Sequence, residues 1–353
     1  MAEWMDEARR RIGRAFDAAG LGPQEAPYRI LGEWPGARVR AYHDPHGPAG
    51  PVLLIVAAPF KRAYIWDLLP EVSVVRRCLD RGFRVFLLEW SLPTEREDGF
   101  GLAEYADRLP MAAIERIEAE TGSPAPILAG HSLGGTFAAI FATLHPERVR
   151  GLILVDAPLA FGRYAGPLGR AVAAIPHARV IRAWAGSPVP GSAINLLCSS
   201  AAPDAFQIQR YSDLAASSLD PRALAIHMRV ERWTYDEFPV PGRLFEETLE
   251  QLYRQNRFLS GTLRVGERRT GIASLRTHVI AVINPFGRVV PPNSILKGLD
   301  AGRPLSCEIL EYEGDRGPMF QHLGPLVTPL AHRRLWPRIL DWAEAVSRAE
   351  TGK

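Results

Sequence analysis

The sequence predicts an α/β fold with a doubly wound, mostly parallel sheet and a helical insertion. Short runs that are apolar on both faces alternate with helix-like segments, as in parallel sheets buried on both faces. The pattern Gly-x-Ser-x-Gly joins one of these runs to a helix. From Ala157 to about Leu263 the alternation is lost and helical segments with Pro, Gly and aromatic residues follow. These observations indicate a sheet of strands and crossover helices, interrupted by an insertion.

The elements follow in chain order. Residues 1–20 form an amphipathic, charged segment typical of a helix, and residues 28–42 alternate as an edge hairpin does. Further strands are expected at residues 51–56, 83–88, 126–128, 151–155, 277–283 and 305–310. Helices are expected at residues 68–81, 102–120, 136–142 and 335–348. An insertion after residues 151–155 would cover the carboxyl ends of the strands as a lid.

These elements divide the chain into four parts. We expect an N-terminal helix (1–25), the first part of the core (26–158), a lid or cap (159–263) and the second part of the core (264–353).

The turn at residues 129–135 predicts a nucleophile elbow, in which a strained serine backbone pushes the Ser132 hydroxyl into the open. Gly130 and Gly134 are then a steric requirement, because a Cβ at either position would collide with the neighbouring element. The helix begins directly after Ser132, so the Leu133 amide is a candidate oxyanion donor. A second donor is expected from the loop after residues 51–56. Because Pro59 has no N–H, this donor is Phe60 or Lys61, and we take Phe60 as the candidate.

A serine hydroxyl needs a base to take its proton, and in this fold the histidine follows the last strand. His322 stands in that loop. His332 is a rival, but it lies beside Arg333 and Arg334 at the start of the closing helix, which indicates a charged face. We therefore expect His322 to be the base.

The acid is harder to assign, because the loop after residues 277–283, where this fold normally carries it, contains no carboxylate. Asp156, at the end of the strand after the elbow helix, is the candidate acid, although a structural carboxylate at a strand end is equally compatible with it. Glu313 and Asp315, in the loop of the histidine, are alternatives. Asn284 or a water molecule is the uncharged alternative.

Composition bounds the remaining classes. The chain has 353 residues, 47% hydrophobic and 23% charged, enough for one large core with a cap. Its net charge is only +3 with acidic residues interspersed, which argues against a nucleic-acid partner. Three cysteines without CxxC spacing suggest neither a disulfide framework nor a metal site. With no signal-like N-terminus and no long apolar run, we expect a cytoplasmic protein without an integral membrane segment.

Several motifs resemble those of the polyhydroxyalkanoate synthases, particularly the short two-subunit type. They include Glu231-Arg232-Trp233 and Leu252-Tyr253-Arg254-Gln255-Asn256 in the insertion, so the likeness is not confined to the sheet. The similar stretches are residues 62–70, 73–76, 82, 89–93, 134–136, 145–146, 189–191, 231–233, 240–242, 252–256 and 289–292. The resemblance implies an α/β-hydrolase core with a lid. It also implies acyl transfer from (R)-3-hydroxyacyl-coenzyme A to a growing polyester by a Cys–His–Asp triad.

The chain departs from that family at two of the three triad positions. The nucleophilic cysteine of the family falls on Ser132, its aspartate falls on Gly287, and only its histidine carries over, as His322. A serine ester exchanges acyl groups less readily than a thioester does. Hydrolysis or a single acyl transfer is therefore expected in preference to repeated chain transfer.

These observations favour a serine-nucleophile hydrolase or acyltransferase acting on aliphatic hydroxyacyl esters, thioesters or polyester. Its expected catalytic residues are Ser132, His322 and Asp156, with Leu133 and Phe60 as oxyanion donors. We expect no bound cofactor, with coenzyme A as a leaving group of the substrate. One alternative is a polyhydroxyalkanoate synthase proper, with a partner subunit or as a homodimer. The other is a weak or inactive paralogue that binds a synthase or a polymer granule.

Overall fold

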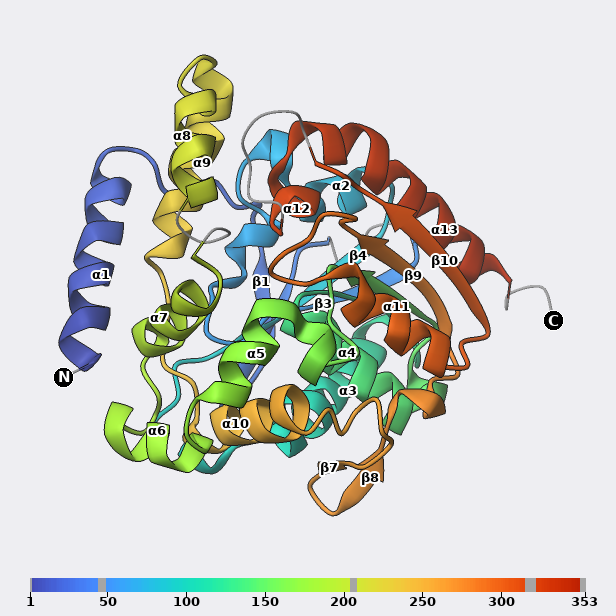
Figure 1. Cartoon of the computed structure of the whole chain (residues 1–353). Coiled ribbons are helices and arrows are strands. Elements are labelled where there is room, and N and C mark those ends of the chain that lie inside the picture. The colour runs from blue at the N-terminus through green and yellow to red at the C-terminus, as the bar shows by residue number, and fades with distance from the viewer. Residues whose placement is uncertain (1, 44–48, 204–207, 315–321, 350–353) are drawn as a thin grey trace.

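The computed structural model describes residues 2–43, 49–203, 208–314 and 322–349, and is built on one eight-stranded sheet (Figure 1). The strand order is β1-β2-β4-β3-β5-β6-β9-β10. The strands are β1 (Arg29–Trp34), β2 (Ala37–Ala41), β3 (Val52–Val56), β4 (Arg84–Trp90), β5 (Ile127–His131), β6 (Gly151–Val155), β9 (His278–Ile283) and β10 (Ser306–Glu311). β1 and β2 pair antiparallel at one edge, and all strands from β4 to β10 in that order run parallel. The predicted doubly wound, mostly parallel fold is confirmed.

The central strands are the apolar runs of the sequence. Every residue of β3, β5 and β6 is buried, because helices cover both faces of the sheet. In the parallel register, Gly130 of β5 lies opposite Val56 of β3 and Leu154 of β6. The carboxyl ends of three neighbouring strands therefore meet beside Ser132.

Helices lie on both sides of the sheet (Figure 1). α3 (Leu109–Thr121) and α4 (Leu133–Leu144) pack on one side, and α2 (Val74–Asp80) and α13 (Trp336–Arg348) lie beside each other on the other. The helix expected at residues 68–81 begins later than predicted. Ser73 caps α2 by accepting a hydrogen bond from the Arg76 N–H at 2.9 Å, while Pro70 begins a separate 3-10 turn.

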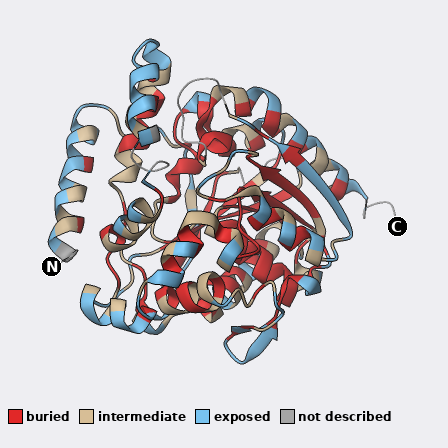
Figure 2. Cartoon of the chain, viewed as in Figure 1, coloured by how far each residue is buried: buried red, intermediate tan, exposed pale blue. Residues whose placement is uncertain are grey.

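Among the residues that the structure describes between β6 and β7, the regular elements are helices joined by short irregular segments. These helices are α5 (Gly166–Ala174), α6 (Ala178–Ala185), α7 (Gly191–Ala201), α8 (Gln209–Ser217), α9 (Pro221–Thr234) and α10 (Gly242–Glu247), followed by a π-helix (Thr248–Arg254). The N-terminal helix α1 (Ala2–Ala18) packs against α7 and α9 of this lid (Figure 1). Buried residues concentrate around the sheet, whereas α1, α6 and α8 show wide exposed faces (Figure 2).

Sequence reasoning missed two short strands and two helices. The strands β7 (Leu263–Val265) and β8 (Arg268–Thr270) form a separate short hairpin, too short to show a period of two. The helices α11 (Pro292–Ala301) and α12 (Gly324–Val327) were also not anticipated. In the described part of the chain, no helix combines the length and apolar character needed to cross a bilayer.

Candidate active site

Ser132 occupies a strained turn between β5 and α4. Its backbone has φ 54° and ψ −133°, a left-handed conformation that is costly for a residue with a side chain. Its amide donates a hydrogen bond to the carbonyl oxygen of Val155 at 3.0 Å, which ties the turn to β6. The turn therefore has the backbone geometry expected of a nucleophile elbow.

The glycines around Ser132 have no room for side chains. A Cβ at Gly130 would lie 2.4 Å from the Gly135 nitrogen, and one at Gly134 would lie 2.4 Å from the Val56 carbonyl oxygen. Gly135 is equally restricted, since a Cβ there would lie 2.5 Å from the Ala157 side chain. These approaches allow α4 to begin directly against β5 and β3.

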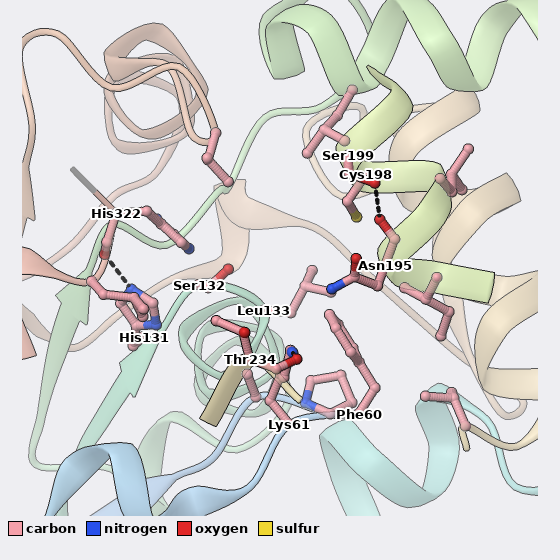
Figure 3. A pocket seen from close by; sticks show the side chains of 18 of the residues that line it. Phe60, Lys61, His131, Ser132, Leu133, Asn195, Cys198, Ser199, Thr234 and His322 are labelled. Carbon is pink, nitrogen blue, oxygen red and sulfur yellow. Dashed lines mark hydrogen bonds between the residues drawn. The ribbon is translucent and has the colours of Figure 1, made fainter. Parts of the chain in front are cut away.

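His322 lies beside the elbow, and its ring points toward the Ser132 hydroxyl (Figure 3). Behind the ring, His322 Nδ1 is 3.7 Å from Asp156 Oδ2. That separation is longer than a hydrogen bond, although catalytic hydrogen bonds are often long before substrate binds. The structure thus brings Ser132, His322 and Asp156 to one place, in the order of a nucleophile, a base and an acid.

Asp156 is buried directly after β6 and has a φ of 43°. Its Oδ1 accepts a hydrogen bond from the Asn284 amide at 3.1 Å, so the neighbouring loop helps to hold the carboxyl group. Burial raises the pKa of Asp156 to about 7. Burial also lowers the pKa of His322 to about 4, so the imidazole is neutral at neutral pH and able to accept a proton.

His131 is a site residue that sequence reasoning missed. Its Nε2–H donates to the backbone carbonyl oxygen of His322 at 2.8 Å (Figure 3), and the two rings stack with centroids 4.3 Å apart. Burial lowers the pKa of His131 to about 3, which keeps this ring neutral. The available signal was a histidine inside an otherwise apolar strand, at the residue before the nucleophile.

The two oxyanion candidates flank the serine. Leu133 is the first residue of α4, and Phe60 lies in the loop after β3 with a φ of 59°. Both residues line the same cavity as Ser132. The Phe60 carbonyl oxygen accepts a hydrogen bond from the Phe238 amide of the lid at 3.2 Å, which fixes the peptide plane after Phe60.

The structure describes three of the alternative residues, His332, Glu313 and Asn284. His332 is buried, with Nε2 2.8 Å from the Leu326 carbonyl oxygen, and is not on a charged face as expected. It does not line the cavity, whose lining includes His322. Glu313 is exposed, and Asp315 lies outside the described residues. The Asn284 side-chain oxygen accepts a hydrogen bond from the Phe286 amide at 2.8 Å, within its own loop.

Ser132 opens into a cavity of about 570 Å³ between the core and the lid. Aliphatic and aromatic side chains of the lid line much of it, including Leu168, Val172, Leu197 and Phe245. In the close view, Asn195, Cys198 and Ser199 of α7 face Ser132 across the space (Figure 3). Within the ranges that the structure describes, no group of His, Cys, Asp and Glu is arranged to hold a metal ion.

Comparisons with known proteins agree with this fold. A family model described as alpha/beta hydrolase fold matches residues 66–173. The chain is 27% identical over 300 residues to the poly(3-hydroxyalkanoate) polymerase subunit PhaC of Haloferax mediterranei, covering 85% of this chain and 59% of the relative. It is 26% identical over 306 residues to the subunit of the same name from Allochromatium vinosum, covering 85% and 83%. Over most of its length the chain is therefore similar to polyhydroxyalkanoate synthase subunits, and it carries an alpha/beta hydrolase fold.

The chain spans about three fifths of the length of some relatives, covering 59% of the Haloferax mediterranei protein and 60% of the Haloarcula marismortui protein. Among solved structures, the enol-lactonase from Burkholderia xenovorans LB400 is similar with a TM-score of 0.53 and 13% identity, covering 89% of this chain and 98% of that one. A thioesterase domain from the curacin biosynthetic pathway has a TM-score of 0.50 and 16% identity, covering 90% and 100%. At these identities the likeness concerns the fold alone.

The position to which the resemblance assigns an aspartate has no room for one in this chain. Gly287 lines the cavity, but a Cβ there would lie 2.5 Å from the Val290 carbonyl oxygen. Its amide donates to the Asn284 carbonyl oxygen at 3.0 Å, in a tight turn after β9. The carboxylate near His322 comes instead from Asp156, which follows β6, the strand beside β9 in the sheet.

Proposed function

We propose that this chain is a serine-nucleophile acyl-transfer enzyme, acting on aliphatic hydroxyacyl esters, thioesters or polyester. The observation that carries the proposal is the convergence of Ser132, His322 and Asp156 at one wall of the cavity between core and lid, with His322 Nδ1 3.7 Å from Asp156 Oδ2. A hydroxyl, a neutral imidazole and a carboxyl in this order are the parts of a serine acyl-transfer site.

In the proposed mechanism, Ser132 Oγ attacks the substrate carbonyl carbon while His322 Nε2 takes the hydroxyl proton. The Leu133 and Phe60 amides donate to the oxyanion of the tetrahedral intermediate. Collapse of the intermediate breaks the bond to the leaving alcohol or thiol, which receives the proton from His322. Water or an acceptor hydroxyl then attacks the acyl-serine and gives its proton to His322. Collapse of this second intermediate breaks the bond between the acyl carbon and Ser132 Oγ, which takes the proton back from His322. Asp156, as a carboxylate, orients the ring and stabilises its protonated form.

The lining of the cavity supports an aliphatic substrate. Leu168, Val172, Leu197 and Phe245 surround the space above Ser132, and burial of each methylene of an acyl chain against such residues contributes about 0.8 kcal/mol. Coenzyme A enters this proposal as a leaving group, with no separate cofactor.

A second candidate is polyester synthesis by Ser132, either in a homodimer or with a partner subunit. The names of the relatives, poly(3-hydroxyalkanoate) polymerase subunits, favour it. It predicts polymer and free coenzyme A from 3-hydroxybutyryl-coenzyme A, whereas the hydrolase predicts monomeric acid and coenzyme A.

The test of the proposal uses a fluorophosphonate probe on the intact protein. We expect the probe to label Ser132, and Ser132→Ala to remove the label while the protein stays folded. Product analysis after incubation with 3-hydroxybutyryl-coenzyme A then separates hydrolysis from synthesis. Absence of labelling and turnover in folded protein would overturn both candidates. Capture of an active synthase by the Ser132→Ala protein would then point to the binding paralogue.

A further inference from the structure

The lid is fastened to the loop that carries Phe60. This loop follows β3, and the lid segment that comes directly after α9 runs alongside it. Lys61 and Glu237 form an antiparallel bridge between the two segments. The Phe60 carbonyl oxygen accepts the Phe238 amide at 3.2 Å, and the Arg62 carbonyl oxygen accepts the Trp233 indole N–H at 2.8 Å. The loop is thus held against the lid at Phe60 itself and at the two residues that follow it.

Glu237 is the buried charge at the centre of this junction. Its side chain is only 2% exposed. Its Oε1 accepts a hydrogen bond from Lys61 Nζ at 2.9 Å, and its Oε2 accepts one from Arg9 Nε of α1 at 2.6 Å. Asn195 of α7 also donates to Oε1. One carboxylate therefore joins the Phe60 loop, two lid elements and the N-terminal helix.

The electrostatics of the junction depend on that carboxylate. Lys61 is partly shielded from water and also donates to the Thr234 carbonyl oxygen at 2.9 Å, while Arg9 donates to the same oxygen at 2.8 Å. Without the negative charge of Glu237, the two cations that face this carbonyl oxygen would lose the carboxylate to which both are hydrogen-bonded. Removing one partner of a buried ion pair leaves an uncompensated charge, so Lys61 would move away and carry its loop with it.

Phe60 makes this movement consequential. Its φ of 59° is a conformation that a phenylalanine keeps only when its surroundings hold it there. The residue after it is Lys61, the residue tied to Glu237. Release of Lys61 would let the Phe60 peptide relax and turn its amide away from the cavity.

We propose that Glu237 is a positioning residue, which acts through Lys61 to hold the Phe60 amide in place as an oxyanion donor. The inference rests on the proposed serine acyl-transfer function and extends it. It makes the docked lid a part of the catalytic apparatus, because the oxyanion site is complete only while the end of α9 is fastened to the loop after β3.

The test compares Glu237→Gln with a matched control, Glu250→Gln. Glu250 is also a buried lid glutamate, which accepts hydrogen bonds from the Ala178 amide at 2.8 Å and Arg254 Nε at 2.9 Å, away from the Phe60 loop. For each protein, fluorophosphonate labelling of Ser132 and the kcat and KM for p-nitrophenyl butyrate are measured below the midpoint of thermal unfolding.

We expect Glu237→Gln to slow labelling and lower kcat by roughly tenfold to a hundredfold, because a displaced oxyanion donor is felt in the transition state. KM should change little, since ground-state contacts in the cavity are retained. Glu250→Gln should lower the midpoint of thermal unfolding by about as much as Glu237→Gln does, while it keeps the wild-type labelling rate. A general role in lid stability would instead slow both variants alike.

Lys61→Met provides a second route if Glu237→Gln does not fold. It removes the link to the loop and leaves Glu237 paired with Arg9, so no buried charge is stranded. The same loss of kcat is expected. Wild-type labelling with unchanged rates in folded Glu237→Gln or Lys61→Met would overturn the positioning role alone, whereas unlabelled wild-type protein would overturn the serine enzyme itself.

Discussion

Phe60, Ser132 and Asp156 each have a φ in the left-handed region, at 59°, 54° and 43°. They follow β3, β5 and β6, which are neighbours in the sheet, and all three line the cavity. Such a conformation costs a residue with a side chain on the order of 1–3 kcal/mol. The three strained residues carry an oxyanion donor, the nucleophile and the acid of the proposed site, so each strand end contributes one function.

His131 connects this group to the histidine loop. His131→Phe keeps a ring of similar size for the stacking but removes the Nε2–H that donates to the His322 carbonyl oxygen at 2.8 Å. We expect kcat for ester hydrolysis to fall by about tenfold, because the base is no longer held in its productive position. Steady-state kinetics with p-nitrophenyl butyrate measure this.

His332→Phe is the matched control. It removes an equivalent hydrogen bond, which joins His332 Nε2 to the Leu326 carbonyl oxygen at 2.8 Å, at a buried site outside the cavity. The control should lose stability and keep its kcat. Equal losses of kcat in the two variants would contradict the role given to His131.

At the residue scale, the sequence predicted positions where local chemistry is decisive. The glycines on either side of Ser132, which no other residue could replace, predicted the turn that carries it. The position of His322 after the last strand predicted it as the base. Asp156 could only be a candidate, because its distance to His322 depends on which strands are neighbours in the sheet. The spacing of residues along the sequence does not give that order. His131 was missed because a histidine at the end of a buried strand is compatible with ordinary core packing.

At the scale of elements, the long apolar strands and amphipathic helices were predictable, and the short or glycine-containing ones were not. Helix α11 includes Gly298, where a Cβ would lie 2.2 Å from the Leu159 side chain. Glycine weakens a helical pattern in the sequence, but here it permits close packing between helix and loop. The start of α2 was misplaced because the apolar stretch before Ser73 belongs to a 3-10 turn and an extended segment.

The turn after β9 gives a prediction at this scale. Gly287→Asp would restore a carboxylate at the position that the synthase resemblance implies. Its Cβ would meet the Val290 carbonyl oxygen at 2.5 Å and the Asn284 carbonyl oxygen at 3.1 Å, so the turn would have to open. We expect no gain in kcat/KM for ester hydrolysis, and a loss of about 1–3 kcal/mol in the free energy of unfolding measured in urea.

Phe286→Asp is the control, since it adds the same charge at a neighbouring side chain that is 62% exposed. It should leave the free energy of unfolding within about 0.5 kcal/mol of wild type. If Gly287→Asp instead raised kcat/KM at unchanged stability, the turn would have room for the acid, and the assignment to Asp156 would be wrong.

At the scale of the whole molecule, the lid is held between the core and α1. Asp6 of α1 accepts a hydrogen bond from the Ser192 amide at 2.9 Å, at the start of α7, and Arg232 of α9 pairs with Asp17 at 2.8 Å. Sequence periodicity predicted α1 as a helix, but not where it packs, because its contacts are with residues about two hundred positions away. The lid and the N-terminal helix thus form one layer over the cavity.

The free energy of unfolding should depend on pH, because the carboxyl group of Asp156 is buried. Folding raises the pKa of Asp156 from 3.8 to about 7, so below pH 3.8 the carboxyl is neutral in both states and contributes no difference. Between those values the folded state binds the proton more tightly, and stability falls as pH rises. Above about 7 the full cost is present, at about 1.4 kcal/mol for each unit of raised pKa.

Asp156→Asn is neutral at every pH and should therefore be more stable than wild type at pH 8, by about 2–4 kcal/mol relative to the difference at pH 4. Urea unfolding of both proteins at the two pH values measures this. The other titrating groups are common to both proteins and cancel to first order in the comparison. The same substitution should lower kcat, because the imidazole of His322 loses its orienting charge. If the difference in the free energy of unfolding between the two proteins were the same at pH 4 and pH 8, the pKa of Asp156 would not be raised by folding. The carboxylate would then have a stabilising partner closer than His322, which lies 3.7 Å away.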